Sequence, residues 1–159
     1  MLNGDTVAIK QIFLENVNSE KLSIFENEIS VLQKLKHPNI VQYKDYFSTK
    51  KYMNIVLEYV EGGSLQSLIK QKNITVTEDL LNKYIKQVLE GLDYIHSQGI
   101  VHRDIKAANL LYTKDAVVKL ADFGFAYILN DDEKTNSLVG SPFWMPPEII
   151  QQTGKVMFI

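Results

Sequence analysis

The stretch His102-Arg103-Asp104-Ile105-Lys106-Ala107-Ala108-Asn109 carries a dense group of polar and charged side chains directly after an apolar helical pattern. A carboxylate, a lysine and an asparagine this close together are costly to bury unless they have partners or a function. Asp104 can accept a hydroxyl proton, and Lys106 can neutralise a phosphoryl group that is being transferred. Each of these residues alone is typical of a solvated loop, and only their combination points to chemistry.

A second polar group follows at Asp122-Phe123-Gly124. Asn109 and Asp122 can supply the hard oxygen ligands that Mg2+ prefers in proteins. Gly124 allows a backbone twist that a Cβ atom would resist. The two segments together therefore favour a site that handles a phosphate with the help of a divalent cation.

A pair of opposite charges lies near the N-terminus. Lys10 stands among apolar neighbours in a strand predicted over residues 6–14, so its ammonium needs an anion if it points inward. Glu28, on an amphipathic helix predicted over residues 19–36, can provide that anion. The alternative is that Glu28 lies on a solvated face beside Glu26 and has no partner. The spacing alone supports both interpretations equally.

Length and composition narrow the class of protein. The chain has 159 residues, a net charge of −2, 45% hydrophobic residues and no cysteine. These values are typical of an ordinary globular protein, and they exclude disulfides, a thiolate nucleophile and Cys-ligated zinc. The near-neutral charge argues against a nucleic-acid partner. Because no apolar run approaches the roughly 20 residues of a membrane span and the first ten residues lack a signal-peptide pattern, we expect a cytoplasmic protein without a membrane span.

The order of predicted elements indicates an α+β fold in two parts. Residues 1–60 are predicted to form a β-rich part with one helix, and residues 61–159 a helical part with a small hairpin. Thr77 is expected to cap the long helix of the second part, and Gly99 to end it. Further strands are predicted over 40–47, 52–60, 109–112 and 117–120.

Four motifs in order resemble the signatures of a eukaryotic protein kinase domain. They are Val7-Ala8-Ile9-Lys10, the 102–109 stretch, Asp122-Phe123-Gly124 and Pro146-Pro147-Glu148. The resemblance covers residues 4–148 and implies a two-lobed fold that uses ATP and Mg2+. Lys106 and the stretch 140–145 are similar to the serine/threonine type, which phosphorylates Ser and Thr hydroxyl groups of proteins, rather than to the tyrosine type. The stretches Glu58–Leu65 and Val88–His96 are similar to the MAP kinase kinase kinase and sterile-20-like groups, and among them most to septation-initiation-type kinases, which implies a signalling cascade.

The resemblance implies a role for each site residue. Those at the nucleotide are Lys10 at the phosphates, Glu28 as its partner, Glu58 and Val60 as the hinge, Leu57 as the gatekeeper, and Ala8 and Leu111 above and below the base. Those at the transferring group are Asp104 as catalytic base, Lys106 as phosphate contact, and Asn109 and Asp122 as magnesium ligands, with His102 and Arg103 in support.

Regulatory residues follow from the same resemblance. Ser137 matches a phosphorylation position that an upstream activator would use, and Arg103 would then pair with the added phosphate. The alternative is that Ser137 is a polar loop residue. Ser141 stands where the family usually has threonine, and its hydroxyl is expected to bridge Asp104 and Lys106.

The sequence departs from the family pattern at both ends. The chain starts too late for the glycine-rich loop, of which Gly4 is the trailing edge, and it stops before the later large-lobe helices, so we expect a fold truncated at both ends. Apolar residues of 84–95 and 117–120 would then face water. Two hypotheses follow: a Mg-ATP-dependent serine/threonine kinase, or a catalytically inactive kinase fragment or pseudokinase-like binding module.

Overall fold

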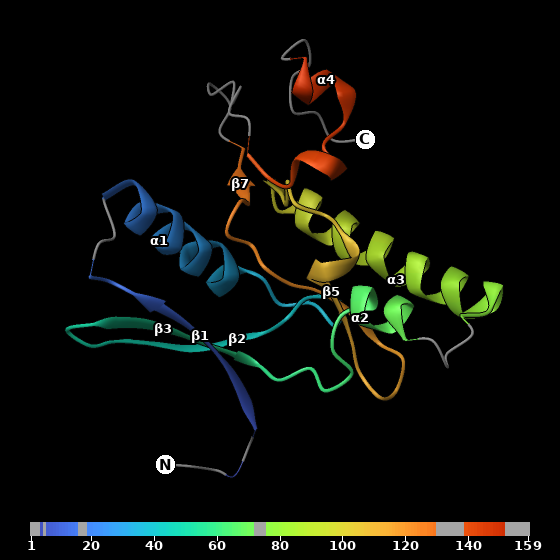
Figure 1. The fold of residues 1–159 in the computed structure, drawn as a ribbon, viewed down its shortest axis with the longest axis horizontal. Coiled ribbons are helices and arrows are strands. Elements are labelled where there is room, and N and C mark those ends of the chain that lie inside the picture. Colours follow the sequence, from blue (N-terminus) through green and yellow to red (C-terminus); the bar gives the residue numbers. More distant parts are fainter. Residues whose placement is uncertain (1–3, 5, 16–18, 72–75, 130–138, 152–159) are drawn as a thin grey trace.

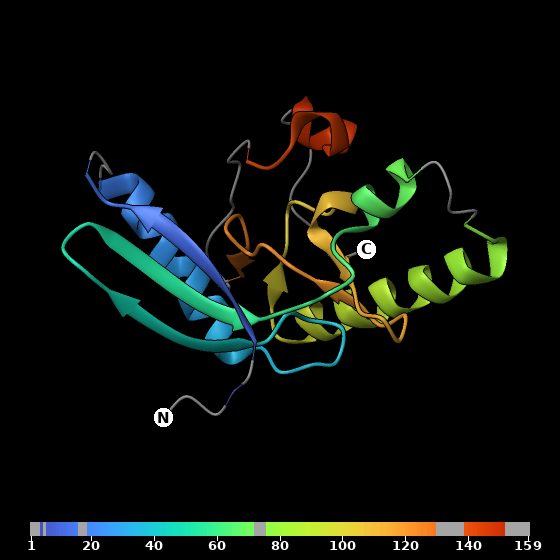
Figure 2. The same cartoon turned by 60° about the horizontal axis from the view of Figure 1, so that its bottom comes forward.

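A three-stranded antiparallel sheet and one helix form the N-terminal part of the structure, a computed structural model that describes residues 4, 6–15, 19–71, 76–129 and 139–151. The strands are β1 (Val7–Phe13), β2 (Tyr43–Ser48) and β3 (Tyr52–Glu58), in the order β1-β3-β2. Helix α1 (Ser19–Lys34) lies along one face of this sheet (Figures 1 and 2). The register of β1 against β3 places Lys10 opposite Ile55 and Ala8 opposite Leu57.

The C-terminal part is mainly helical, with two small two-stranded sheets. Its elements are α2 (Leu65–Lys70), α3 (Glu78–Ser97), β4 (Ile100–Val101), η1 (Ala107–Asn109), β5 (Leu110–Tyr112), β6 (Val118–Leu120), β7 (Tyr127–Ile128), η2 (Pro142–Trp144) and α4 (Pro147–Ile150). Strand β4 pairs with β7, and β5 pairs with β6. Figures 1 and 2 place β4 and β7, coloured yellow and orange, between α1 and α3, and the β5–β6 hairpin beside α2 and α3.

The local signals for α3 are confirmed. The Thr77 hydroxyl accepts a hydrogen bond from the backbone N–H of Leu80, as an N-cap residue does, and acidic residues fill the first turn. At the other end Gly99 has a φ of +70°, the left-handed conformation in which helices commonly terminate. The helix therefore begins and ends where its capping residues predict.

One apolar core joins the two parts. Buried Leu32 from α1 packs with Ile95 from α3, Leu120 from β6 and Phe123. The stretch after α1 is also tied to β6, because Leu120 donates its N–H to the carbonyl of Asn39 at 2.8 Å and accepts from the N–H of Val41 at 2.9 Å. These contacts fix the sheet and α1 relative to the segment that carries the polar motifs.

Several sequence expectations change at this junction. The strand predicted to begin at Ile40 begins at Tyr43, because Ile40 instead forms a parallel bridge with Leu120. The exposure expected for residues 117–120 is wrong: Val118 and Leu120 are fully buried, since β6 packs against α3 and the α1 core. The short elements α2, β4 and β7 were not predicted.

The exposure expected for α3 is confirmed for one row of its side chains. Ile85 and Leu89, together with Leu81 just before the expected range, are about half exposed, whereas Tyr84 and Ile95 are buried. We call Leu81, Ile85 and Leu89 the α3 stripe. Within the described residues, no helix has the length and apolar character needed to cross a membrane.

Candidate functional site

The centre of the site is the carboxylate of Asp104, in the loop between β4 and η1. Its Oδ2 accepts hydrogen bonds from Lys106 Nζ at 2.7 Å and from Asn109 Nδ2 at 2.9 Å. Its Oδ1 accepts the backbone N–H of Ser141 at 3.0 Å. Lys106 and Asn109, which the sequence grouped with Asp104, therefore converge on its carboxylate together with Ser141.

These contacts decide the charge of Asp104. Burial by itself would raise the pKa of this carboxyl group, but the hydrogen bonds from Lys106, Ser141 and Asn109 outweigh it. The pKa of Asp104 therefore lies below its usual value, and the group is ionised at neutral pH. An ionised carboxylate of lowered pKa binds and orients a hydroxyl group well but is a weak base.

Ser141 contacts both Lys106 and Asp104, and it uses its hydroxyl and its backbone N–H to do so. Its hydroxyl accepts a hydrogen bond from Lys106 Nζ at 2.5 Å. The backbone N–H of Ser141 donates to Oδ1 of Asp104 at 3.0 Å, and the Ser141 side chain also contributes to the lowered pKa of Asp104. A serine and a threonine at this position would make the same backbone contact.

Buried His102 supports the loop that carries Asp104. Its Nδ1 accepts the backbone N–H of Asp104 at 3.3 Å, so its Nε2 carries the proton that is shared with the carbonyl of Ala121 at 3.1 Å. Burial lowers the pKa of His102, which keeps the ring neutral. The ring also lies 4.8 Å from the ring of fully buried Phe123, centroid to centroid. His102 therefore connects the Asp104 loop to the Asp122-Phe123-Gly124 segment.

The N-terminal charge pair is formed. Lys10 Nζ lies 2.8 Å from both carboxylate oxygens of Glu28 and 2.9 Å from Oδ1 of Asp122. Burial opposes the charge of Lys10, but the two carboxylates raise its pKa, so it remains an ammonium ion. Burial raises the pKa of Glu28, and Lys10 offsets only part of that effect. The alternative of a solvated, unpaired Glu28 is wrong, since its side chain is 1% exposed.

Asn109 and Asp122 fit the requirements of a magnesium site. The amide nitrogen of Asn109 donates to the carbonyl and Oδ2 of Asp104, which leaves its amide oxygen as the group available to a cation. The carboxylate of Asp122 is 45% exposed. In the described part of the chain no group of three or more His, Cys, Asp or Glu residues could hold a metal. A site with few protein oxygens suits Mg2+, which usually completes its shell with water and substrate phosphates.

The residues expected around the adenine come from three strands. Ala8 on β1 lies opposite the predicted gatekeeper Leu57 on β3, and Leu111 lies on β5. The connection after β3, which contains buried Val60, returns to β5 through a bridge between Ser64 and Leu111. The fold thus brings the hinge stretch next to the strand that carries Leu111.

Lys119, which the sequence reasoning missed, makes an ion pair with the predicted hinge residue. Its Nζ lies 2.9 Å from Oε1 of Glu58, and Oε2 of Glu58 accepts the backbone N–H of Gln42 at 3.0 Å. Lys119 is paired with Leu111 across β5 and β6. Alternation in the strand Val118-Lys119-Leu120 was the available signal, because it turns the lysine away from the core.

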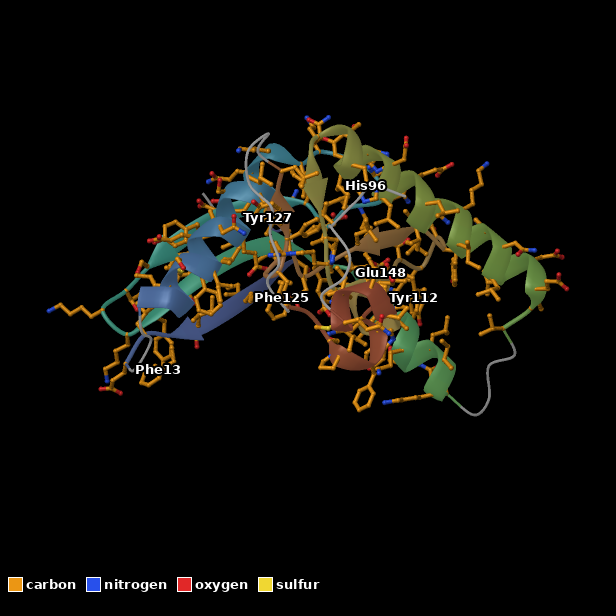
Figure 3. The ribbon with its side chains drawn as sticks, turned by 90° about the horizontal axis from the view of Figure 1, so that it is seen from above. Phe13, His96, Tyr112, Phe125, Tyr127 and Glu148 are labelled. Carbon is orange, nitrogen blue, oxygen red and sulfur yellow. The ribbon has the colours of Figure 1, made fainter. Side chains whose placement is uncertain are left out.

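Arg103 is held by the segment that follows Gly124. Its Nε donates to the carbonyl of Phe125 at 2.6 Å, and its guanidinium lies 5.1 Å from the ring centroid of Tyr127. Figure 3 shows Phe125 and Tyr127 beside α1. Ser137, the predicted phosphorylation position, lies outside the described residues.

Comparisons with known proteins agree on one family. The family model described as "Protein kinase domain" matches residues 1–157. "MAP3K epsilon protein kinase 1" of Brassica napus is 53% identical over 154 residues, which are 96% of this chain and 12% of that protein. "Cell division control protein 7" of Schizosaccharomyces pombe is 48% identical over 96% of this chain and 14% of its own length. "Cytokinesis protein sepH" of Aspergillus niger is 46% identical over 95% of this chain and 11% of its own length. The chain thus spans less than one-sixth of the length of these relatives.

Proposed function

Because this chain belongs to the protein kinase domain family, as an enzyme of the serine/threonine type, we propose that its site transfers the γ-phosphoryl group of ATP to a Ser or Thr hydroxyl of a protein. The observation that carries this proposal is the convergence of Lys106, Asn109 and Ser141 on the carboxylate of Asp104. Phosphoryl transfer depends mainly on positioning and on charge stabilisation, which such a cluster supplies.

Asp104 would receive the substrate hydroxyl. A carboxylate has about four acceptor positions, and Lys106, Asn109 and Ser141 occupy three of them. The remaining position is on Oδ1, where the hydroxyl would bind and finally give up its proton. Because the Asp104 side chain is 1% exposed, we expect residues 139–141 to shift when a substrate arrives.

The two lysines would stabilise phosphate charge. The ammonium of Lys106 has three donors, of which Asp104 and Ser141 use two, so one is available to the γ-phosphate. Lys10 and Asp122 now contact each other at 2.9 Å. On nucleotide binding Lys10 would exchange this contact for phosphate oxygens, and Asp122 with Asn109 would hold the Mg2+, which neutralises charge on the phosphates. Glu28 would keep Lys10 in place.

The adenine would bind the hinge backbone of Glu58 and Val60, between Ala8 and Leu111 and next to Leu57. The names of two relatives refer to cytokinesis and cell division control, and we propose a signalling kinase of that kind with a protein substrate. Ser137 would be its phosphorylation position, used by an upstream activator. A cytoplasmic location stays a prediction.

The test is a phosphate-transfer assay on a generic serine/threonine peptide, preceded by thermal unfolding with and without Mg-ATP. Nucleotide at a hundredfold its dissociation constant should stabilise a folded binder by about 2.7 kcal/mol. Lys10→Met and Asp122→Asn should abolish transfer, and Ser137→Ala should affect activation more than chemistry.

The matched control is Asp104→Asn, which keeps the size of the side chain. Transfer that survives this substitution would come from a contaminating kinase. Nucleotide binding without transfer would favour the alternative, a pseudokinase-like binding module, and unfolding that ignores nucleotide would favour an inactive fragment.

A further inference from the structure

Two consecutive carbonyl groups after Gly124 are held by side chains from two separate elements. The carbonyl of Phe125 accepts a hydrogen bond from Arg103 Nε at 2.6 Å, in the loop that also carries Asp104. The carbonyl of Ala126 accepts a hydrogen bond from Nδ2 of Asn27, on α1, at 2.9 Å. The segment is therefore fastened on one side to the catalytic loop and on the other side to α1.

This segment begins with a strained residue. Asp122 has a φ of +63°, in the left-handed region that non-glycine residues seldom occupy. Such a conformation persists only where surrounding contacts hold it. Phe123 contributes one such contact by its burial, and the turn closed by the Ala126 N–H on the Phe123 carbonyl at 2.9 Å contributes another. The Asn27 bond holds that same turn at its far end.

Asn27 stands directly before Glu28, so two neighbouring residues of α1 make separate contacts with the site. Glu28 binds Lys10, which binds Asp122, while Asn27 binds the backbone of Ala126. The loop lies close to the helix between these points, because a Cβ atom added to Gly124 would lie 3.6 Å from Oε2 of Glu28. A displacement of α1 would therefore move Lys10 and the Asp122 loop together.

We propose that Asn27 is a positioning residue that couples the placement of α1 to the conformation of Asp122, and through it to magnesium binding. This inference rests on the proposed function, since it assigns Asp122 to a Mg-nucleotide. Asn27 contacts no substrate and acts through the backbone of Ala126. Its loss should weaken the contribution of Mg2+ to nucleotide binding more than the contribution of the hinge.

The test compares nucleotide affinity with Mg2+ and with EDTA, by calorimetry on the whole chain with ATP. In Asn27→Leu, which keeps the size but removes the donor, we expect Mg-ATP affinity to fall about fivefold, the factor that one net hydrogen bond supplies. Affinity in EDTA should change less than twofold. Asn27→Gln, which keeps an N–H donor, should recover part of the loss.

The matched control is Gln33→Ala, which removes another amide of α1 that binds the Tyr43 hydroxyl at 3.3 Å. It should leave both affinities unchanged. Equal losses with Mg2+ and with EDTA in Asn27→Leu, or the same pattern in Gln33→Ala, would overturn the inference.

A second measurement does not depend on nucleotide. Amide hydrogen exchange of Ala126 in the free chain should be about fivefold faster in Asn27→Leu than in wild type and unchanged in Gln33→Ala. A wild-type chain that binds no Mg-ATP would overturn the proposed function, and faster exchange would still support the role of Asn27 in holding the loop. Unchanged exchange would overturn that role whatever the nucleotide does.

Discussion

Replacing Lys10 by methionine should destabilise the fold by leaving a buried carboxylate without its cation. Both oxygens of Glu28 bind Lys10 Nζ at 2.8 Å, and the Glu28 side chain is 1% exposed. Removing one partner of a fully buried ion pair costs about 3–5 kcal/mol. Because the Lys10 side chain is 34% exposed and partly screened by water, we expect a loss of about 2–3 kcal/mol here.

A second substitution separates the unpaired charge from the lost packing. Lys10→Met combined with Glu28→Met replaces the ion pair by apolar groups of similar size, which is often neutral or even stabilising. The double variant should therefore be more stable than Lys10→Met alone. The assay is urea unfolding at pH 7, followed by circular dichroism.

The stability of Lys10→Met should also depend on pH, in a direction that follows from the pKa of Glu28. In Lys10→Met, burial continues to raise the pKa of Glu28 while the offset from the ammonium is gone. The folded state then holds a proton at pH values where the unfolded state has released it, so stability rises as pH falls through that window. The deficit relative to wild type should shrink by at most about 1.4 kcal/mol per pH unit between pH 7 and the unfolded-state pKa near 4.5. A deficit independent of pH, together with additive effects in the double variant, would refute this reasoning.

Three further substitutions test other parts of the structure. Burial lowers the pKa of His102, so the unfolded state gains a proton first and stability should fall as pH drops below about 6.5; in His102→Gln the urea-unfolding free energy should depend less steeply on pH. Ser141→Ala removes the 2.5 Å contact to Lys106, and steady-state kinetics should show kcat reduced about tenfold with little change in KM for ATP. Ile85→Lys alters the exposed α3 stripe, and light scattering should show less self-association while stability changes by less than about 0.5 kcal/mol.

Local sequence signals were sufficient where a residue acts on its near neighbours along the chain. Thr77 caps α3 and Gly99 ends it. The apolar spacing of α1 predicts which face of the helix is buried, and Leu32 lies on that face. Sequence spacing alone did not decide whether Lys10 and Glu28 form an ion pair, because a strand and a helix can be joined at several angles. The packing of α1 on the sheet decides it.

The same local signals could not predict contacts between residues that lie far apart in the sequence. The two-residue ladder of β4 and β7 is too short to leave a periodic pattern. Ile40 looked like part of a strand with its sequence neighbours, but it pairs with Leu120, far along the chain. A polar side chain such as that of Asn27 on an amphipathic helix is expected to face solvent. The sequence gives no sign that the carbonyl of Ala126 lies within hydrogen-bonding distance of it.

The strained residues explain why a site of this kind cannot be read from propensity. Arg103 and Asp122 both have left-handed backbone angles, with φ of +64° and +63°. Each stands next to a residue that must be aimed: Asp104 follows Arg103, and buried Phe123 follows Asp122. A glycine at either position would relieve strain of about 1 kcal/mol or more. Arg103→Gly would also remove the hydrogen bond to Phe125, and Asp122→Gly would remove the carboxylate that contacts Lys10, so relief of strain and loss of the site come together.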